Sequence, residues 1–308
     1  MEGWINLYKP KGISSSKATL ILKPLVWPNK IGHCGTLDLE AHGVLPVAIG
    51  NATKFVDLVS NQRKKYFFTV QFGACTDTGD SAGKYVETTN IIPSNEDMCK
   101  VCDRFLGTIT QTPSKFSAIK INGQRAYKLA RSEQEFEMPS RQVHIYCLKL
   151  VACGEGWASY EVECSKGTYV RSLAEQMASC LQSLGFVIDL ERLSVGKFCA
   201  NSALSLDLFK CPHPSALVNL KSNLLNLEFA LDDILVLSIA ESDAQKIAYG
   251  SSIDAPCSDD NSVCVKYNGK IVAIGLVKDK RFIPKKVFNN NLNLKEDSLD
   301  VDYTRKES

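Results

Sequence analysis

Residues 144–164, HIYCLKLVACGEGWASYEVEC, are the stretch of the sequence that most directly indicates the fold. Two runs, from His144 to Cys153 and from Trp157 to Cys164, are rich in aromatic and β-branched residues. The Gly154-Glu155-Gly156 between them is typical of a hairpin turn. A helix is expected next, from Thr168 to Leu184, because its apolar residues repeat with helical spacing and Gly185 can end it.

A further strand and a further helix are expected before this hairpin. Residues 64–73, KKYFFTVQFG, are aromatic and β-branched and predict a strand that runs into a loop. Residues 94–107 predict a helix with a capping box from Ser94 to Asp97 and with Gly107 as its stop. Strands and helices are thus interspersed without regular βαβ alternation, which favours an α+β sheet domain over a doubly wound one.

The length of 308 residues predicts one large domain, or one medium domain with a small one. The stretch Cys211 to Asn226, rich in Pro, Ser and Asn, is the best candidate for a boundary. We expect a catalytic domain over residues 1–228 and a small β-rich domain over residues 229–288. Its strands are predicted at residues 234–239, 263–267, 271–277 and 282–287, with Asn268-Gly269 as a hairpin turn. Residues 289–308 are polar and predict a disordered tail.

Composition narrows the class of protein. Hydrophobic residues make up 44% and charged residues 23% of the chain, which is near the globular average and excludes wholesale disorder. No run of about 18 apolar residues predicts a membrane-spanning helix, and Met1 to Gly12 do not resemble a signal peptide. We therefore expect a soluble cytoplasmic protein. The net charge of +2 does not by itself indicate a nucleic-acid partner, and the basic clusters at residues 63–65 and 278–286 are only weak evidence for one.

The twelve cysteines show no repeating spacing. Cys99 and Cys102 form a CxxC pair, but a structural zinc site would need a second pair with similar spacing, which the sequence lacks. We interpret both cysteines as small buried residues on the predicted helix over residues 94–107. No metal is expected.

The most informative motif for function is Gly32 to Pro46, GHCGTLDLEAHGVLP. Three glycines bracket Asp38 in a predicted loop before an apolar run. Glycines allow close backbone approaches, and functional side chains concentrate on such loops. A turn with a solvated aspartate would have the same composition, so the motif alone does not decide the chemistry.

Two further motifs flank this loop in the sequence. Lys9 to Ser15, KPKGISS, precedes it, and Cys164 to Arg171, CSKGTYVR, follows it. In this order and spacing, the three motifs resemble the bacterial TruB family of tRNA pseudouridine-55 synthases. Additional similar blocks extend the resemblance over about residues 4–200: Lys65-Tyr66, Thr76 to Asp80, Gln111 to Lys120, and Leu190 to Leu193.

The resemblance implies a fold, an activity and a partner. The fold is the pseudouridine synthase fold, with a mixed, largely antiparallel central sheet flanked by helices, followed by a small PUA-like RNA-binding domain. The activity is the isomerisation of uridine 55 in the tRNA T loop, in which the N1 glycosidic bond breaks and the ribose rejoins the base through C5. The partner is the T-arm of tRNA, bound by a monomer without a guide RNA or a cofactor.

The resemblance also implies three catalytic residues. Asp38 is the catalytic carboxylate, which can stabilise or capture the sugar C1′ or remove a nearby sugar proton, and the sequence does not choose among these roles. Arg171 is expected to pair with Asp38 and to hold it ionised and oriented. Tyr66 is expected to stack on the flipped uracil, and its hydroxyl to help take the C5 proton.

Further residues are expected to bind the substrate. Leu190 would line the apolar side of the pocket, and His33 would enter the gap left by the flipped nucleotide. The matching motifs also imply substrate-binding roles for Lys9, Lys120 and Tyr169.

The chain departs from the family pattern at three positions. The pattern usually has Thr-Gly, a proline after the aspartate, and Ala-Thr-Gly, where this chain has Cys34, Leu39 and His42. None of these changes removes an expected catalytic group, although His42 is expected to alter RNA contacts near Asp38.

Two other classes of function stay open. A tRNA-binding folding helper would have no need for Asp38 paired with Arg171. A metal-dependent hydrolase would need more clustered carboxylates or histidines than Glu40 and His42 beside Asp38.

Overall fold

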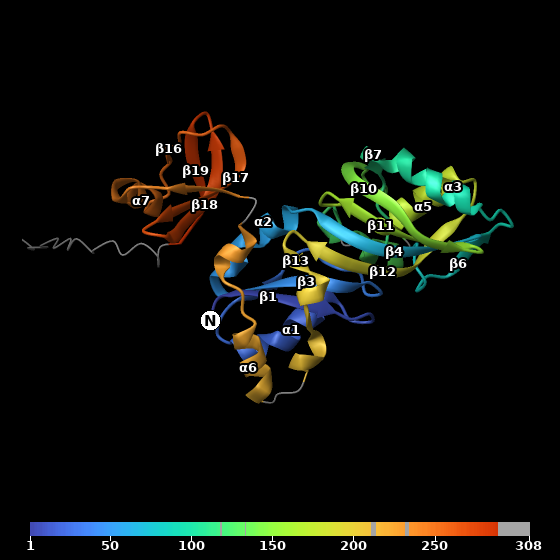
Figure 1. Cartoon of the computed structure of the whole chain (residues 1–308), viewed down its shortest axis with the longest axis horizontal. Helices are drawn as coiled ribbons and strands as arrows, with labels where there is room; N and C mark the ends of the chain where they lie inside the picture. The colour runs from blue at the N-terminus through green and yellow to red at the C-terminus, as the bar shows by residue number, and fades with distance from the viewer. Residues whose placement is uncertain (118, 133, 211–213, 232–233, 289–308) are drawn as a thin grey trace, which may run out of the picture. The chain divides into compact units, whose positions relative to one another are not determined.

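The computed structural model describes residues 1–117, 119–132, 134–210, 214–231 and 234–288 (Figure 1). The chain divides into two compact units, Met1–Ala230 and a second unit that begins at Leu231. The division lies close to the expected one at residues 228 and 229. No helix in these described ranges is long and apolar enough to cross a membrane. The expected disordered tail, residues 289–308, lies outside the described residues.

A ten-stranded sheet forms the centre of the first unit. Its main strand order is β14-β1-β3-β12-β4-β11-β10-β7, while β13 pairs with β12 and β2 with β3. The pairs β1 with β14 and β3 with β12 are parallel, and the other pairs are antiparallel. The expected mixed, largely antiparallel sheet is therefore confirmed. The strands are β1 Gly3–Lys9, β2 Ile31–His33, β3 His42–Ile49, β4 Lys64–Phe72, β7 Gly107–Gln111, β10 Arg141–Gly154, β11 Trp157–Cys164, β12 Gly185–Val195, β13 Phe198–Cys199 and β14 Leu204–Ser205.

The predicted hairpin and the strand before it are confirmed. β10 and β11 pair antiparallel and close at Gly154 opposite Trp157. β4 lies on the other side of β11. Its alternate residues Phe68, Val70 and Phe72 are buried because side chains of a strand point to the two faces of a sheet in turn.

Helices cover the two ends of this sheet (Figure 1). α1 (Ser15–Val26) and α6 (Pro214–Ser222) pack beside β1 and β3, where Leu22 and Leu220 join one buried cluster. α5 (Val170–Cys180) and α3 (Asn95–Lys100) pack beside β4, β11 and β10, where Met98 and Met177 join another. The short α2 (Val56–Asn61) follows a 3₁₀ helix, η1 (Gly50–Phe55).

The helix predicted over residues 168–184 is confirmed in place but ends earlier than expected. It closes at Cys180 because Gln182 adopts a left-handed φ of 55° and the Ser183 N–H donates to the Ala178 carbonyl at 3.0 Å. Gly185 is not its stop but the first residue of β12. A Cβ there would lie 2.8 Å from the Ala178 Cβ, so the glycine lets helix and sheet approach each other.

The helix predicted over residues 94–107 is also shorter than expected. Ser94 caps α3 as predicted, since its Oγ accepts the Asp97 N–H at 3.1 Å and donates to the Asp97 carboxylate at 2.6 Å. At Val101 the chain changes to a 3₁₀ helix, η2 (Val101–Phe105). Cys102 is buried, but Cys99 is exposed, so the expectation that both are buried was wrong for Cys99.

The Pro, Ser and Asn-rich stretch expected as a boundary belongs to the first unit. Its residues 214–222 form α6, with Ala216 and Leu220 buried. The stretch expected as a boundary candidate thus lies before the division at Ala230, because the core near α1 buries Leu220 of α6.

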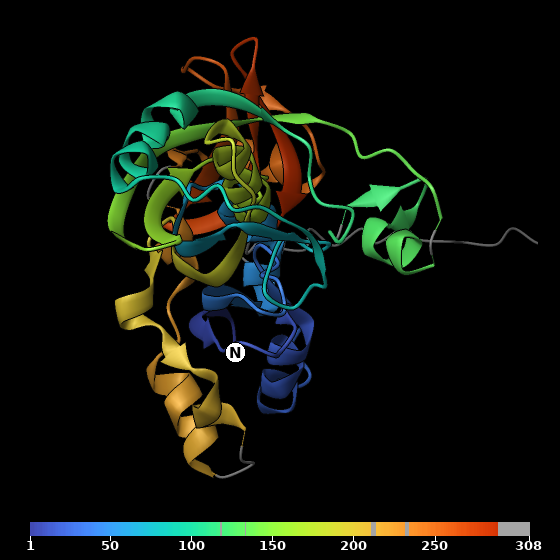
Figure 2. The ribbon, with the colours of Figure 1, turned by 90° about the vertical axis from the view of Figure 1, so that its right-hand side faces the viewer.

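Two small hairpins also belong to the first unit. β5 (Ala74–Thr76) pairs with β6 (Tyr85–Thr88), and β8 (Lys120–Ile121) pairs with β9 (Gln124–Arg125). α4 (Ala126–Arg131) follows β9 directly. Figure 2 shows this second hairpin and α4, in green, reaching away from the sheet.

The described residues of the second unit form a small five-stranded sheet with one helix. The strand order is β15-β17-β18-β19-β16. The hairpin turn at Asn268-Gly269 is confirmed, with φ of 47° and 73° at the two residues, as a two-residue turn of this kind requires. α7 buries Ala244 and Ile247 against this sheet. The elements are β15 Leu235–Ser238, α7 Glu241–Ala248, β16 Ile253–Asp254, β17 Asp260–Tyr267, β18 Lys270–Lys278 and β19 Arg281–Val287.

Candidate active site

Asp38 lies in the loop between β2 and β3, and its two neighbours are fixed by hydrogen bonds. The Ser15 hydroxyl accepts the Leu37 N–H at 2.9 Å and donates to the Leu37 carbonyl at 3.1 Å. On the other side, the Gly12 N–H donates to the Leu39 carbonyl at 2.9 Å. The backbone is therefore held on both sides of Asp38, while its side chain stays 39% exposed.

The structure brings Arg171 and Asp38 together. Arg171 is the second residue of α5, and its side chain is only 4% exposed. One terminal nitrogen lies 2.8 Å from an Asp38 carboxylate oxygen. The other lies 3.5 Å from Asp80 and donates to the Thr78 carbonyl at 2.6 Å. The guanidinium is thus fixed from two directions and can orient the Asp38 carboxylate.

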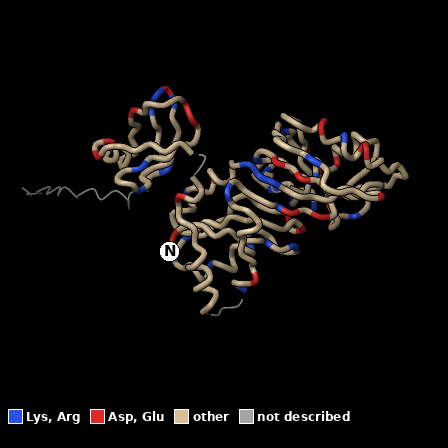
Figure 3. The backbone as a smooth tube through the Cα atoms, in the orientation of Figure 1, with Lys and Arg blue, Asp and Glu red and all other residues tan. Residues whose placement is uncertain are grey.

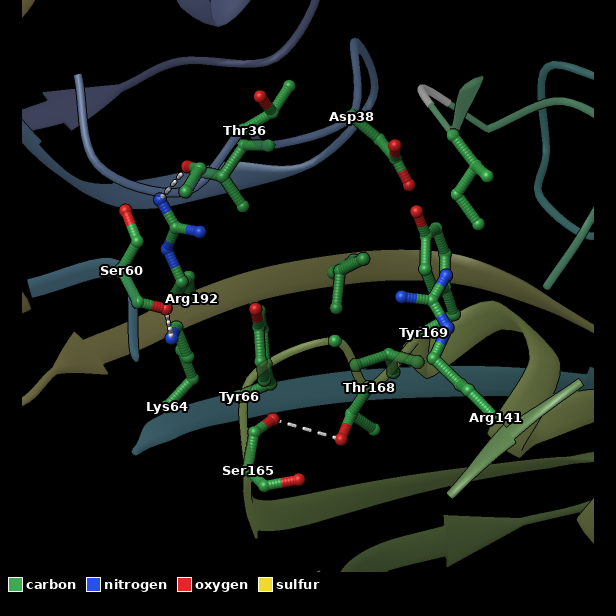
Figure 4. A pocket seen from close by; sticks show the side chains of 16 residues that line it. Thr36, Asp38, Ser60, Lys64, Tyr66, Arg141, Ser165, Thr168, Tyr169 and Arg192 are labelled. Atoms are coloured by element: carbon green, nitrogen blue, oxygen red, sulfur yellow. Dashed lines mark hydrogen bonds between the residues drawn. The ribbon is translucent and has the colours of Figure 1, made fainter. Parts of the chain in front are cut away.

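A pocket of about 310 Å³ opens beside this ion pair. Asp38, Tyr66, Tyr169 and Leu190 line it. Figure 4 shows Asp38, Tyr66 and Tyr169 around the cavity, with the Tyr169 hydroxyl pointing toward Asp38. Of the eight residues that the sequence assigned to the site, these four border the pocket, and Arg171 adjoins it through Asp38.

Tyr66 and Arg192 line the pocket from neighbouring strands. Tyr66 on β4 pairs in register with Arg192 on β12. Arg192 is buried and donates from Nε to the Val44 carbonyl at 2.7 Å and from a terminal nitrogen to the Gly35 carbonyl at 2.9 Å. Burial raises the pKa of Tyr66, with Arg192 opposing the change, so the phenol keeps its proton at neutral pH.

Tyr169 is held by Gln111 and Arg141. Its N–H donates to the Gln111 side-chain oxygen at 3.0 Å, and the Gln111 amide donates back to the Tyr169 carbonyl at 3.3 Å. The Arg141 guanidinium lies 4.8 Å from the centroid of the tyrosine ring, which is a cation–π distance. Leu190 is 9% exposed and supplies apolar surface to the pocket.

Lys9, His33 and Lys120 do not line this pocket. Lys9 is fully buried, and its ammonium donates to the carbonyls of Pro10, Ile13 and Leu39 at 2.9, 2.9 and 3.4 Å. It therefore fixes the Asp38 loop from within and has no surface for direct contact with RNA. Burial lowers its pKa to about 8.

His33 and Lys120 lie elsewhere on the first unit. His33, in β2, is half-buried, and burial together with the Arg192 charge lowers its pKa, so the ring is neutral at pH 7. Lys120 is exposed on the projecting β8–β9 hairpin.

The sequence did not single out four charged residues that the structure places at or beside the site: Asp80, Lys64, Arg141 and Arg192. Asp80 and Arg192 belong to motif blocks quoted above, and this could have identified them as site residues. Lys64 belongs to the basic run Arg63-Lys64-Lys65 at the start of β4, which Figure 3 shows in blue. Unlike its neighbours it is buried, and it donates to the carbonyls of Ser60 and Gln62 at 2.5 and 2.6 Å.

The charge of the pocket lining is predominantly positive. Lys64, Arg141 and Arg192 line it together with one carboxylate, Asp38, which Arg171 already pairs. Aromatic faces with nearby cations suit a flat, phosphate-bearing ligand such as a nucleotide. In the part of the chain that the structure describes, no three His, Cys, Asp or Glu side chains gather as a metal site.

Comparisons with known proteins agree with this picture. Residues 23–170 match the model of the N-terminal domain of TruB family pseudouridylate synthases. The tRNA pseudouridine synthase B of Rickettsia bellii (strain OSU 85-389) is 47% identical over 293 residues, which cover 93% of this chain and 98% of the relative. That of Rickettsia akari (strain Hartford) is 46% identical over 290 residues, with the same coverage.

Solved structures resemble the chain in fold. An H/ACA RNP bound to a substrate RNA containing 2′-deoxyuridine gives a TM-score of 0.67, and a Cbf5-Nop10-Gar1 complex gives 0.68. Each is 20% identical and covers 93% of this chain and 84% of the matched chain. At this identity the similarity supports the fold alone.

Proposed function

The chain belongs to the TruB family of pseudouridylate synthases, and on that basis we propose that it converts uridine 55 in the T loop of tRNA to pseudouridine. Its relatives at 46–47% identity carry the name tRNA pseudouridine synthase B over nearly their whole length. The observation that carries the proposal is the 2.8 Å contact between Asp38 and the buried Arg171, beside a pocket lined by Tyr66 and Tyr169.

The reaction is an isomerisation, so no atom is gained or lost overall. The bond between N1 and C1′ breaks, the base turns within the pocket, and a bond forms between C1′ and C5. The C5 proton then leaves, and N1 ends with a proton. Asp38 acts at the sugar, either by stabilising or capturing C1′ or by removing a nearby proton. Arg171 orients it for any of these roles.

The uridine must leave its stack before it can reach Asp38. Flipping costs a few kcal/mol, which contacts in the pocket must offset. Tyr66 offers a ring for stacking, and Leu190 offers apolar surface on the neighbouring strand. Lys64, Arg141 and Arg192 provide positive charge for the nucleotide phosphates.

Tyr66 has a second role in the proposal. Its protonated hydroxyl cannot act as a phenolate base, since its pKa is raised by burial. It can instead relay the C5 proton by accepting it while its own proton passes to water in the pocket, and N1 takes up a proton from water. Arg192, which stands opposite Tyr66 in the sheet and is fixed by two carbonyls, places a positive charge near that hydroxyl.

Residues around the pocket take supporting roles. Tyr169 contacts the substrate beside Asp38. Lys9 is a positioning residue for the loop and not a direct ligand of RNA, since its three contacts are backbone carbonyls of the protein. Neutral His33 enters the gap left by the flipped nucleotide, and exposed Lys120 contacts the RNA backbone from the β8–β9 hairpin.

The second unit is proposed to be a PUA-like module that binds tRNA outside the pocket. Exposed basic residues lie at the end of β18, in the following turn and in β19, where they can meet phosphates: Lys278, Lys280, Arg281 and Lys285. We propose that the protein works as a monomer without a guide RNA, and in the cytoplasm, where its tRNA substrate is found.

The direct test is to incubate the purified protein with unmodified tRNA and to map pseudouridine by mass spectrometry. Conversion confined to position 55, and abolished by Asp38→Asn, is the expected result. A protein that binds and refolds tRNA but forms no pseudouridine would instead support the folding-helper alternative.

A further inference from the structure

A network of polar side chains beside the pocket links three segments of the first unit. The Tyr8 hydroxyl of β1 donates to Glu191 at 2.8 Å and lies 2.8 Å from Nδ1 of His42. Nε2 of His42, the first residue of β3, lies 3.1 Å from a carboxylate oxygen of Asp189. The same oxygen accepts Lys11, in the turn after β1, at 2.5 Å.

With Glu191 and Asp189 ionised, the contacts of His42 call for a proton on each ring nitrogen. Tyr8 has one hydroxyl proton, and it is donated to Glu191. The contact between Tyr8 and Nδ1 then requires a proton on Nδ1, because the Tyr8 oxygen can only accept there. The contact between Nε2 and the Asp189 carboxylate requires a second proton, on Nε2. All contacts are made at once when both ring nitrogens are protonated.

The partners of His42 keep their own states in this arrangement. Burial and Glu191 raise the pKa of Tyr8, so it stays a phenol. Burial opposes ionisation of Asp189, but hydrogen bonds from Lys11 and His42 lower its pKa overall. Around the imidazole, β12 thus presents Asp189 and Glu191, β1 presents Tyr8, and the following turn presents Lys11. Glu40, on the loop that carries Asp38, lines a small pocket together with Asp189.

The residues that make these contacts belong to, or directly follow, the segments that line the active site. Asp189 and Glu191 alternate along β12 with Leu190 and Arg192, which line the pocket. His42 directly follows the loop that carries Asp38, and in the parallel pairing of β3 with β12 it stands opposite Glu191. The network therefore ties the end of the Asp38 loop to the strand segment that faces the flipped base.

We propose that doubly protonated His42 is a positioning residue that clamps the Asp38 loop to β12 and sets the distance between Asp38 and the base pocket. The inference rests on the proposed isomerase function and concerns the same site. His42 is one of the positions at which the chain departs from the family pattern stated above. Loss of one proton from His42 leaves one of its two contacts without a hydrogen and loosens the loop.

The test compares single-turnover pseudouridine formation on a T-arm hairpin for wild type and His42→Gln between pH 5.5 and 8.5. At pH 5.5 we expect the variant to be slower by about 10-fold, within the loss of up to about 100-fold that a misplacement of 1 Å can cause. The wild-type advantage should shrink as the pH rises, because loss of a ring proton removes one of the two hydrogen bonds of His42. RNA affinity should be the same for both proteins. His144→Gln, on β10 away from the network, is the matched control and should behave like wild type.

Tyr8→Phe provides a second variant in case His42→Gln unfolds. Without the Tyr8 hydroxyl, a neutral His42 with its proton on Nε2 still satisfies Asp189, so the pH dependence attributed to the clamp should disappear. A wild-type to His42→Gln rate ratio that stays constant with pH, or a Tyr8→Phe protein that retains the wild-type pH dependence, would overturn the proposal. Failure of wild type itself to form pseudouridine would instead refute the proposed function.

Discussion

Replacement of Arg171 by lysine tests the geometry of the ion pair, since the positive charge is kept. One terminal nitrogen of Arg171 meets Asp38 at 2.8 Å and the Phe116 carbonyl at 3.4 Å, while the other meets Asp80 at 3.5 Å and the Thr78 carbonyl at 2.6 Å. A single ammonium cannot occupy both positions. We therefore expect Arg171→Lys to lose at least one charged hydrogen bond, which is worth about 1.5–3 kcal/mol.

If that loss falls on Asp38, the chemical step should slow by about 10- to 150-fold, since about 1.4 kcal/mol corresponds to a factor of ten. The assay is single-turnover release of the C5 hydrogen from a T-arm hairpin labelled at that position, with RNA affinity measured in parallel. Affinity should change little, because the buried side chain is only 4% exposed. Arg104→Lys, an exposed site on η2, is the matched control. A folded Arg171→Lys protein with the wild-type rate would refute the argument that the two-pronged contact orients Asp38.

Four further predictions concern the site and the second unit. Asp38→Asn keeps the shape of the side chain but removes its charge, so turnover should be lost while tRNA binding is retained; equal loss of both in a folded protein would contradict a catalytic role. Tyr66→Phe keeps the ring and should slow turnover by about 100- to 10,000-fold at constant affinity, whereas Tyr66→Leu should also weaken binding by about 1–3 kcal/mol. A chain ending at Ala230 should bind tRNA more weakly and with a shallower salt dependence, yet still modify a T-arm hairpin. Burial lowers the pKa of Lys64 to about 8, so the charged side chain destabilises the folded protein below that pH. The free energy of unfolding of wild type, relative to that of Lys64→Met, should therefore rise between pH 8 and about 10.5. If Lys64 titrates normally, this difference should not change with pH.

The local features of the fold could be predicted from the sequence. Alternating apolar residues and a glycine turn predicted β10 and β11, and the Asn268-Gly269 pair predicted the hairpin of the second unit. Gly185 misled the prediction of a helix end because its small size serves the contact between Ala178 and β12, which lies outside its local sequence. The same holds for α6, whose helix is stabilised by burial of Leu220 against α1 and not by its own composition.

The sequence predicted the site residues that belong to the family motifs and line the pocket. It did not predict the roles of side chains that distant segments of the chain bury. Asp38, Tyr66, Tyr169 and Leu190 border one pocket, in agreement with the resemblance. Lys9 has the composition of a surface residue that binds RNA, but the carbonyl of Leu39, thirty residues later, helps to bury it. The sequence around Arg192 is equally typical of a solvated arginine, and only the pairing of β4 with β12 places it opposite Tyr66.

The order of strands in the central sheet has a consequence for synthesis of the protein. β3 and β4 follow each other along the chain but are separated in the sheet by β12, which the ribosome makes only after residues 73–184. Until then the two early strands have unpaired edges where β12 will lie, and such edges promote aggregation. Arg171 and Arg192 also belong to this late part of the chain, so a nascent chain cannot assemble the Asp38 pocket while the N-terminal half alone has emerged. Long-range pairing of this kind slows folding, and the site becomes complete only when the sheet closes around its last central strand.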